Sequence, residues 1–172
     1  MPTYRLTVEY DGTDFAGWQV QRDQRTAMGV LRAAIDQLTA EKPPMTAAGR
    51  TDAGAHAHGQ VVGIELERAW EPERLRLGLN AHLPADIAVR DVALRAAGFH
   101  ARRDAIDRTY RYVLVQRDLR APVTRRHAWT VRGPLDLDAM RAAAAHLVGT
   151  HDFASFGAAP AVAGTTVRTV HE

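Results

Sequence analysis

The first part of the chain alternates between segments with strand periodicity and segments with helix periodicity. Apolar residues at every second position from Tyr4 to Tyr10 predict a half-buried strand. Thr26 is placed to cap a helix with an apolar stripe from Val30 to Leu38, and Lys-Pro-Pro at 42–44 ends that helix. A glycine-punctuated polar loop separates the two elements, so we expect strand and helix to pack on each other.

The same alternation continues to about residue 95. Residues Gln60 to Leu66 predict a second strand. The sequence Glu71-Pro72-Glu73 predicts the start of a helix, because proline and acidic residues suit the first turn. The sequence LPADIAVRDVALR, residues 83–95, then predicts a returning strand.

The second half of the chain resembles the first in its order of elements. Residues Arg108 to Val115, Ala128 to Val131 and Thr165 to Val170 are predicted strands. Asp136 is placed to cap a helix that Gly149 ends, with an apolar face from Leu137 to Val148 that we expect in the core. Strand–helix–strand units in both halves predict an α+β fold of two related antiparallel sheets with helices on one side.

Composition excludes several classes of protein. The chain has 172 residues, 46% of them hydrophobic, and no cysteine, which rules out disulfides, thiolate nucleophiles and cysteine metal sites. The N-terminus reads as a strand and not as a signal peptide, and no apolar run approaches membrane-spanning length. We therefore expect a cytoplasmic protein that is not inserted in a membrane.

Positive charge is concentrated in one stretch although the net charge of the chain is only +2. Residues 102–132 hold nine arginines and three aspartates. Arginine forks suit phosphates and base edges, so the stretch slightly favours a nucleic-acid partner. A solvated face in an arginine-rich protein is the alternative.

The sequence AAGRTDAGAHAHGQVV at 47–62 holds the first candidate for chemistry. Asp52 is a possible carboxylate nucleophile, and Arg50 is placed to supply the opposite charge that keeps it ionised. The alternative is that Asp52 is a turn residue followed two positions later by a glycine, and spacing alone favours this interpretation.

Other chemistries have weaker support. Asp52 with His56 and His58 resembles part of a metal site, as in a metal-dependent phosphoesterase, but no third-ligand pattern follows. Ser155 is the only serine and lacks a nucleophile-elbow context. No glycine-rich nucleotide-binding motif occurs.

Five blocks resemble the TruA-type tRNA pseudouridine synthase family and appear in that family's order. They are YDGTDFAGWQVQ at 10–21, GRTDAGAHAHGQV at 49–61, NAHLPADIAV at 80–89, FHARRDAIDRTYRYVL at 99–114 and LDLDAMRAAAAHLVGTHDFASF at 135–156. The resemblance covers the whole chain and reverses the preference for a simple turn at Asp52.

The resemblance implies that uridine is isomerised to pseudouridine at positions 38–40 in the anticodon arm of tRNA, without a cofactor or metal. It implies that Asp52 is the nucleophile, that Tyr110 contacts the target base, and that the enzyme is a homodimer. As hypotheses, Arg50 pairs with Asp52, and arginines of the basic stretch hold the RNA backbone: Arg102, Arg103, Arg108 and Arg111.

The resemblance also implies an N-terminal half, residues 1–105, and the start of a C-terminal half, residues 106–172. Family members continue beyond the position of Glu172, so we expect part of a longer enzyme with an incomplete C-terminal half. A non-catalytic RNA-binding α+β module is the main alternative, and it keeps the arginines but gives Asp52 no chemistry.

Overall fold

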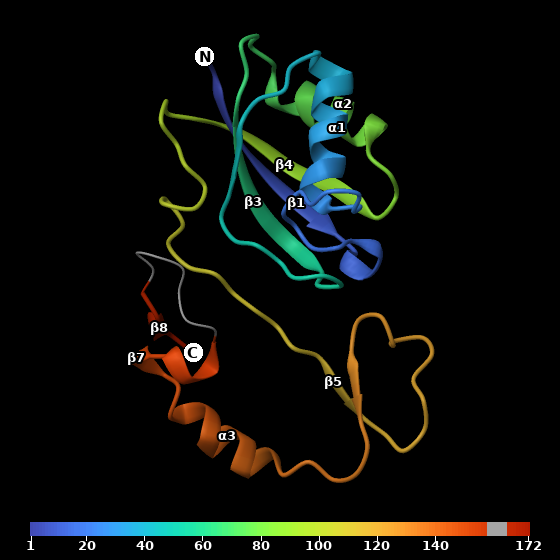
Figure 1. Ribbon diagram of the computed structural model, residues 1–172, viewed down its shortest axis with the longest axis vertical. Helices are drawn as coiled ribbons and strands as arrows, with labels where there is room; N and C mark the ends of the chain where they lie inside the picture. The colour runs from blue at the N-terminus through green and yellow to red at the C-terminus, as the bar shows by residue number, and fades with distance from the viewer. Residues whose placement is uncertain (158–164) are drawn as a thin grey trace. The chain divides into compact units, whose positions relative to one another are not determined.

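The computed structural model describes residues 1–157 and 165–172 (Figure 1). The chain divides into two compact units, Met1–Tyr112 and Val113–Glu172. The boundary between residues 105 and 106 that the sequence suggests stays a prediction. Among the described residues, no helix combines the length and the apolar character needed to cross a membrane.

The first unit is built on one four-stranded antiparallel sheet. Its strands are β1 (Thr3–Tyr10), β2 (Met45–Ala47), β3 (Ala57–Glu65) and β4 (Ile87–Arg95), in the order β2-β3-β1-β4. The predicted alternation along β1 is confirmed, since Tyr4, Leu6 and Val8 are fully buried while the residues between them are half-buried. The three predicted strands of this region all form, with ends shifted by a few residues.

Two helices share one apolar core with this sheet. The helix α1 (Ala27–Thr39) begins where predicted, because the hydroxyl of Thr26 accepts a hydrogen bond from the Gly29 amide at 3.2 Å. The helix α2 (Pro72–His82) follows Glu71, whose carboxylate accepts from the Arg74 amide at 2.8 Å. Leu31 and Leu79 are both fully buried in the core that contains the inward residues of β1. The predicted α+β class is confirmed here.

The second unit contains shorter elements. These are β5 (Leu114–Gln116), β6 (Trp129–Val131), α3 (Leu137–Ala145), β7 (Gly149–Asp152), the short 3₁₀ helix η2 (Ala154–Phe156) and β8 (Val167–Val170). β5 and β6 form a parallel pair, and β7 and β8 form an antiparallel pair. The described residues of this unit therefore hold two separate strand pairs instead of the single second antiparallel sheet that we expected.

Two sequence predictions for the second half are wrong in detail. The strand predicted from Arg108 to Val115 is reduced to β5, and the tyrosines at 110 and 112 before it are 73% and 88% exposed. Alternation signals a strand only where a partner strand is available, and no strand in the described residues pairs with 108–113. The helix capped by Asp136 forms, but it ends at Ala145 and none of its residues is buried, so its apolar face is not core.

Candidate active site

The loop after β1, residues 11–26, is held together by aromatic packing and is called the platform below. Phe15 and Trp18 are 3% and 1% exposed, and the rings of Tyr10 and Trp18 stack with centroids 6.1 Å apart. A carboxylate oxygen of Asp11 accepts from the amide and the hydroxyl of Thr13, which starts the short 3₁₀ helix η1 (Gly12–Asp14). Asp11 thus serves as a turn residue.

The segment that carries Asp52 is bound to this platform along its backbone. The Trp18 amide donates to the Thr51 carbonyl at 3.0 Å, and the Gly54 amide donates to the Phe15 carbonyl at 3.1 Å. The hydroxyls of Tyr10 and Thr51 lie 2.8 Å apart. Burial raises the pKa of Tyr10, so the phenol stays protonated and keeps this hydrogen bond.

Two glycines allow the platform and the Asp52 segment to approach this closely. A Cβ atom on Gly12 would lie 1.9 Å from the carbonyl oxygen of Ala55. Gly17 has a φ of +90°, and a Cβ atom there would lie 2.8 Å from the Thr51 carbonyl oxygen. The block at 10–21 therefore supports the block at 49–61 by direct backbone contact.

Asp52 presents its carboxylate to solvent. Its backbone carbonyl accepts from the Ala55 amide at 3.1 Å, which closes a tight turn. Asp52 is exposed, and within the described residues its carboxylate takes part in no hydrogen bond or ion pair. The turn is thus formed by the backbone, and the side chain is not used to stabilise it.

Asp52 and Arg50 line the same pocket, which has a volume of about 330 Å³. The two side chains form no ion pair with each other among the described residues, so the pairing that we expected is not present in this state. The remaining wall consists of Ala16, Trp18, Gln19, Gln21, Gln24, Thr51 and Ala53, and the three glutamines are polar residues of the platform.

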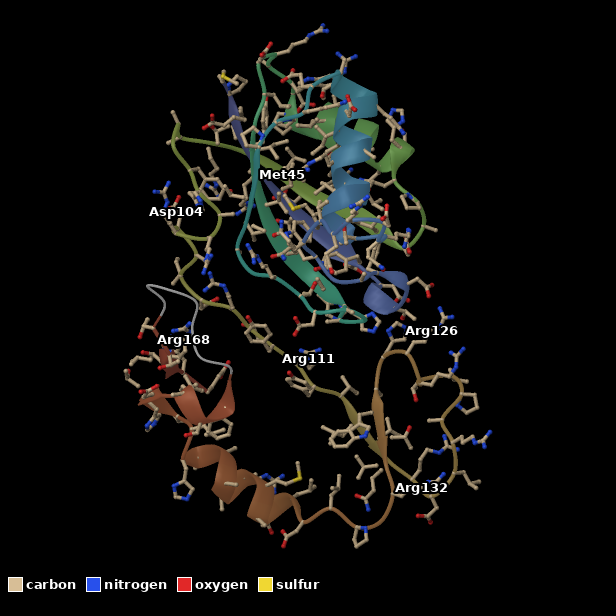
Figure 2. The ribbon with its side chains drawn as sticks, viewed as in Figure 1. Met45, Asp104, Arg111, Arg126, Arg132 and Arg168 are labelled. Carbon is tan, nitrogen blue, oxygen red and sulfur yellow. The ribbon has the colours of Figure 1, made fainter. Side chains whose placement is uncertain are left out.

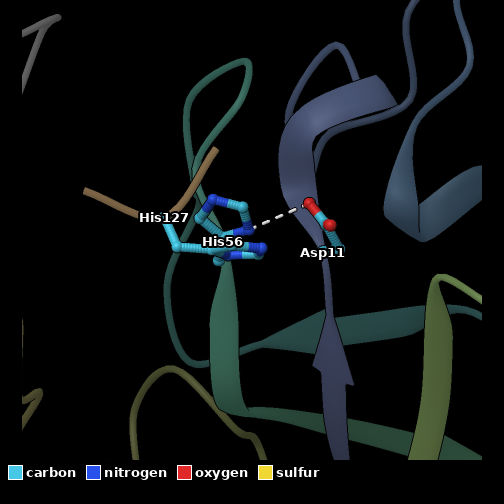
Figure 3. Close-up of side chains that lie close together, drawn as sticks. All are labelled: Asp11, His56 and His127. Atoms are coloured by element: carbon cyan, nitrogen blue, oxygen red, sulfur yellow. Dashed lines mark ion pairs between the residues drawn. The ribbon is translucent and has the colours of Figure 1, made fainter. Parts of the chain in front are cut away.

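His56 supports the loop and is not grouped with Asp52. Its Nδ1 atom lies 3.0 Å from a carboxylate oxygen of Asp11 (Figure 3) and 3.1 Å from the amide nitrogen of Gly12. Nδ1 accepts from that amide when it carries no proton and donates to Asp11 when it is protonated, so either form holds the turn. Within the described chain, Asp52, His56 and His58 do not form a group whose ligand atoms lie close enough to share an ion.

The segment after β4 is attached next to the Asp52 loop. Arg108 donates from Nε to the Ala48 carbonyl at 2.7 Å and from a terminal nitrogen to the Arg102 carbonyl at 3.3 Å. Its guanidinium therefore ties residues 102–108 to the segment between β2 and Asp52. Arg102, Arg103 and Arg111 are exposed, with Arg111 labelled in Figure 2. Tyr110 is also exposed and does not line the pocket of Asp52.

Sequence reasoning missed Arg25, which fastens the platform to the start of β4. Its guanidinium makes two hydrogen bonds to the carboxylate of Asp86, at 2.7 and 2.9 Å, and lies 4.2 Å from the ring centroid of Phe15. The hydrogen bond to Asp86 raises the pKa of Arg25. The two residues are 61 positions apart, and only their presence in or near two of the five blocks signals a shared role.

Replacing Arg25 with glutamine should lower the free energy of unfolding by about 1 kcal/mol. The substitution removes a bidentate ion pair and a cation–π contact, both partly exposed and therefore of modest strength. Urea denaturation measures the effect. Arg22→Gln is the matched control, since Arg22 is 95% exposed, and an equal loss in both variants would contradict a specific role for Arg25.

Comparison with known proteins identifies the family to which these blocks belong. A family described as tRNA pseudouridine synthase matches residues 6–102. The protein named tRNA pseudouridine synthase A from Citrifermentans bemidjiense is 46% identical over 171 residues, which cover 99% of this chain and 68% of that protein. The proteins of the same name from Methylobacterium radiotolerans and Dinoroseobacter shibae are 44% and 46% identical, and the matches cover this whole chain and 68% and 67% of theirs.

The matched region contains the platform and the Asp52 loop, and it ends just before Arg103. The two predicted blocks that pack on each other around Asp52 are thus both inside it. The expectation drawn from those blocks is confirmed, and the chain belongs to the tRNA pseudouridine synthase family, a family of isomerases.

Proposed function

We propose that this protein isomerises uridine to pseudouridine in tRNA, at positions 38–40 of the anticodon arm, with Asp52 as the nucleophile. The observation that carries the proposal is an exposed carboxylate on a rigid backbone turn, with no partner in the described residues, at the wall of a pocket of about 330 Å³. The names of the relatives, tRNA pseudouridine synthase A, support the substrate and the reaction.

The reaction rearranges bonds without any net gain or loss of atoms. The bond between the ribose C1′ and N1 of uracil breaks, and a bond between C1′ and C5 forms. The hydrogen on C5 leaves as a proton, and N1 gains one. Asp52 bonds transiently to a carbon of the sugar or the base and is released at the end, which is nucleophilic catalysis. No oxidation or phosphoryl transfer occurs, so no cofactor is required.

The target base has to leave the RNA stack to reach Asp52. Extrusion of a base costs a few kcal/mol and requires a side chain that replaces the lost stacking. The pocket volume falls within the usual range for ligand sites, roughly 300–1,000 Å³. Arg50 lines the same pocket as Asp52. Its guanidinium is suited to bind a phosphate next to the extruded base or to fill the gap that this base leaves in the RNA stack.

Tyr110 is our candidate for stacking on the extruded base. Tyr110 is 73% exposed and follows Arg108 by two positions, and the side chain of Arg108 donates to the carbonyl of Ala48, between β2 and Asp52. Tyr110→Phe should keep stacking, whereas Tyr110→Ala should lose about 1–3 kcal/mol of transition-state stabilisation. Single-turnover kinetics with tRNA measure both variants. If both lose activity equally, the hydroxyl and not the ring is the important group.

The remaining parts of the proposal concern the assembly and its setting. We propose a homodimer that binds the anticodon arm of tRNA in the cytoplasm, as the family resemblance implies. Four arginines of the basic stretch, Arg102, Arg103, Arg108 and Arg111, would contact the RNA backbone, and all four are exposed.

Tritium release from tRNA that carries uridine labelled at C5 tests the proposed function. Isomerisation must expel the label into water, whereas an RNA-binding module without chemistry releases none. Transcripts in which the three uridines are replaced by cytidine, singly and all together, then report the position. Release that is unaffected by loss of all three would contradict the proposed sites, and no release from any tRNA would contradict the activity.

A further inference from the structure

Three arginines that the proposed mechanism does not use line one pocket in the second unit. Arg120 and Arg125 lie in the segment between β5 and β6, and Arg132, labelled in Figure 2, follows β6 directly. The pocket has a volume of about 480 Å³. Its remaining lining is mostly apolar and consists of Leu119, Ala121, Pro122 and Thr130.

The local fold holds the three arginines around a common space. The Arg117 amide donates to the Val131 carbonyl at 3.1 Å, so the start of the connecting segment is fastened to the end of β6. The Thr124 amide donates to the Ala121 carbonyl at 3.2 Å and forms a turn, and Ala121 is only 5% exposed. Arg120 and Arg125 are therefore carried on backbone that is anchored at two points.

No acidic side chain neutralises this pocket in the part of the unit that the structure describes. None of the three arginines takes part in an ion pair there. Three of the five acids of the unit have other partners: Asp136 caps α3, Asp138 pairs with Arg141 at 2.8 Å, and Asp152 accepts from the Ala154 amide at 3.0 Å. The other two, Asp118 in the connecting segment and Glu172, form no ion pair with the arginines of the pocket in the described residues. Three guanidinium groups without an ion-pair partner make the pocket attractive to an anion.

We propose that this pocket binds a phosphate group of the RNA backbone, with the adjoining nucleoside against Leu119 and Pro122. Guanidinium groups bind phosphate oxygens through paired hydrogen bonds, and three of them can satisfy a phosphodiester from several sides. The volume exceeds what a phosphate alone fills and leaves room for a sugar or base on the apolar wall. The inference rests on the proposed function only in taking RNA as the source of the phosphate.

Binding of tRNA as a function of salt tests this inference. Fluorescence anisotropy is measured for Arg120→Gln, Arg125→Gln and Arg132→Gln at several salt concentrations. Each variant should bind about tenfold more weakly at low salt, and the slope of log K against log salt should fall by about 1. Arg117→Gln is the matched control, because it removes the same charge from the same stretch outside the pocket, and it should change both quantities much less.

Arg125→Lys keeps the positive charge and tests whether the weaker binding of Arg125→Gln comes from a damaged fold. It should retain the salt slope of the unaltered protein and lose affinity only through the missing second hydrogen bond. Pocket variants that behave like Arg117→Gln would overturn the inference. So would loss of uridine monophosphate binding with an unchanged tRNA slope, which would assign the pocket to a free nucleotide.

The inference and the proposed function fail separately. If the unaltered protein releases no tritium but the pocket variants lower the salt slope, the phosphate site stands and the isomerase activity does not. If tritium is released and the slopes of the pocket variants match the control, the activity stands and the phosphate site does not.

Discussion

Replacement of Asp52 by asparagine should abolish tritium release from tRNA, with a fall in the single-turnover rate of at least about 10⁴-fold. An amide of nearly the same shape keeps the backbone turn, because that turn depends on the Asp52 carbonyl and the Ala55 amide and not on the side chain. The amide nitrogen and oxygen cannot form the covalent bond to carbon that the carboxylate provides. The loss should therefore fall on chemistry and leave the fold intact.

Binding and stability separate this prediction from simple damage. Asp52→Asn should bind tRNA no more than about twofold more weakly than the unaltered protein, because the substitution removes a negative charge from the pocket that we propose for the target base. Asp23→Asn is the matched control, because Asp23 is 87% exposed and has a φ of 57°, a conformation that asparagine tolerates. It should retain full activity. Substantial turnover by Asp52→Asn would remove the carboxylate from the mechanism.

The elements around the site were predictable because local rules and packing agree there. The period of two along β1 and the cap at Thr26 both appear in the structure at the expected places. Candidate residues Asp52 and Arg50 were found from one short block, and they line one pocket. The block could not show whether Asp52 and Arg50 form an ion pair, because this depends on their side-chain rotamers and not on their spacing in the sequence.

Contacts between distant segments were beyond sequence reasoning from a single chain. The pair of Arg25 and Asp86 joins positions 61 residues apart, and nothing in the local pattern selects one carboxylate among many. In the second unit, a clear local pattern led to a wrong prediction. The apolar face of α3 has the spacing of a core helix, yet Leu137 is 54% exposed, because periodicity reports what a helix is able to bury and not what lies opposite it.

The basic stretch shows how much a charge count conceals. Of the nine arginines between 102 and 132, the sequence analysis assigned four to the RNA backbone: Arg102, Arg103, Arg108 and Arg111. In the structure Arg108 holds two backbone carbonyls, whereas three others surround a pocket that no charge count would reveal. The sequence therefore predicted the kind of partner better than the residues that would contact it.

Replacement of Gly12 by alanine should cost at least about 1–3 kcal/mol of unfolding free energy, as overpacking does in a filled interior. The new Cβ atom would lie 1.9 Å from the Ala55 carbonyl oxygen and 2.3 Å from its carbon, and both are backbone atoms that cannot rotate away. The loop from Asp52 to Ala55 must then shift relative to the platform. Urea denaturation of the purified variant measures the loss of stability.

The same displacement should reduce catalysis in the molecules that remain folded. Moving a nucleophile by about 1 Å costs roughly 100-fold in rate, because the attacking atom leaves its near-attack position. Single-turnover rates measured at urea concentrations far below the unfolding midpoint separate this effect from unfolding. Gly59→Ala is the matched control, since its Cβ would meet only a methyl group of Thr7 at 3.8 Å, and it should keep both stability and rate. A folded Gly12→Ala with an unchanged rate would show that the contact between platform and loop does not position Asp52.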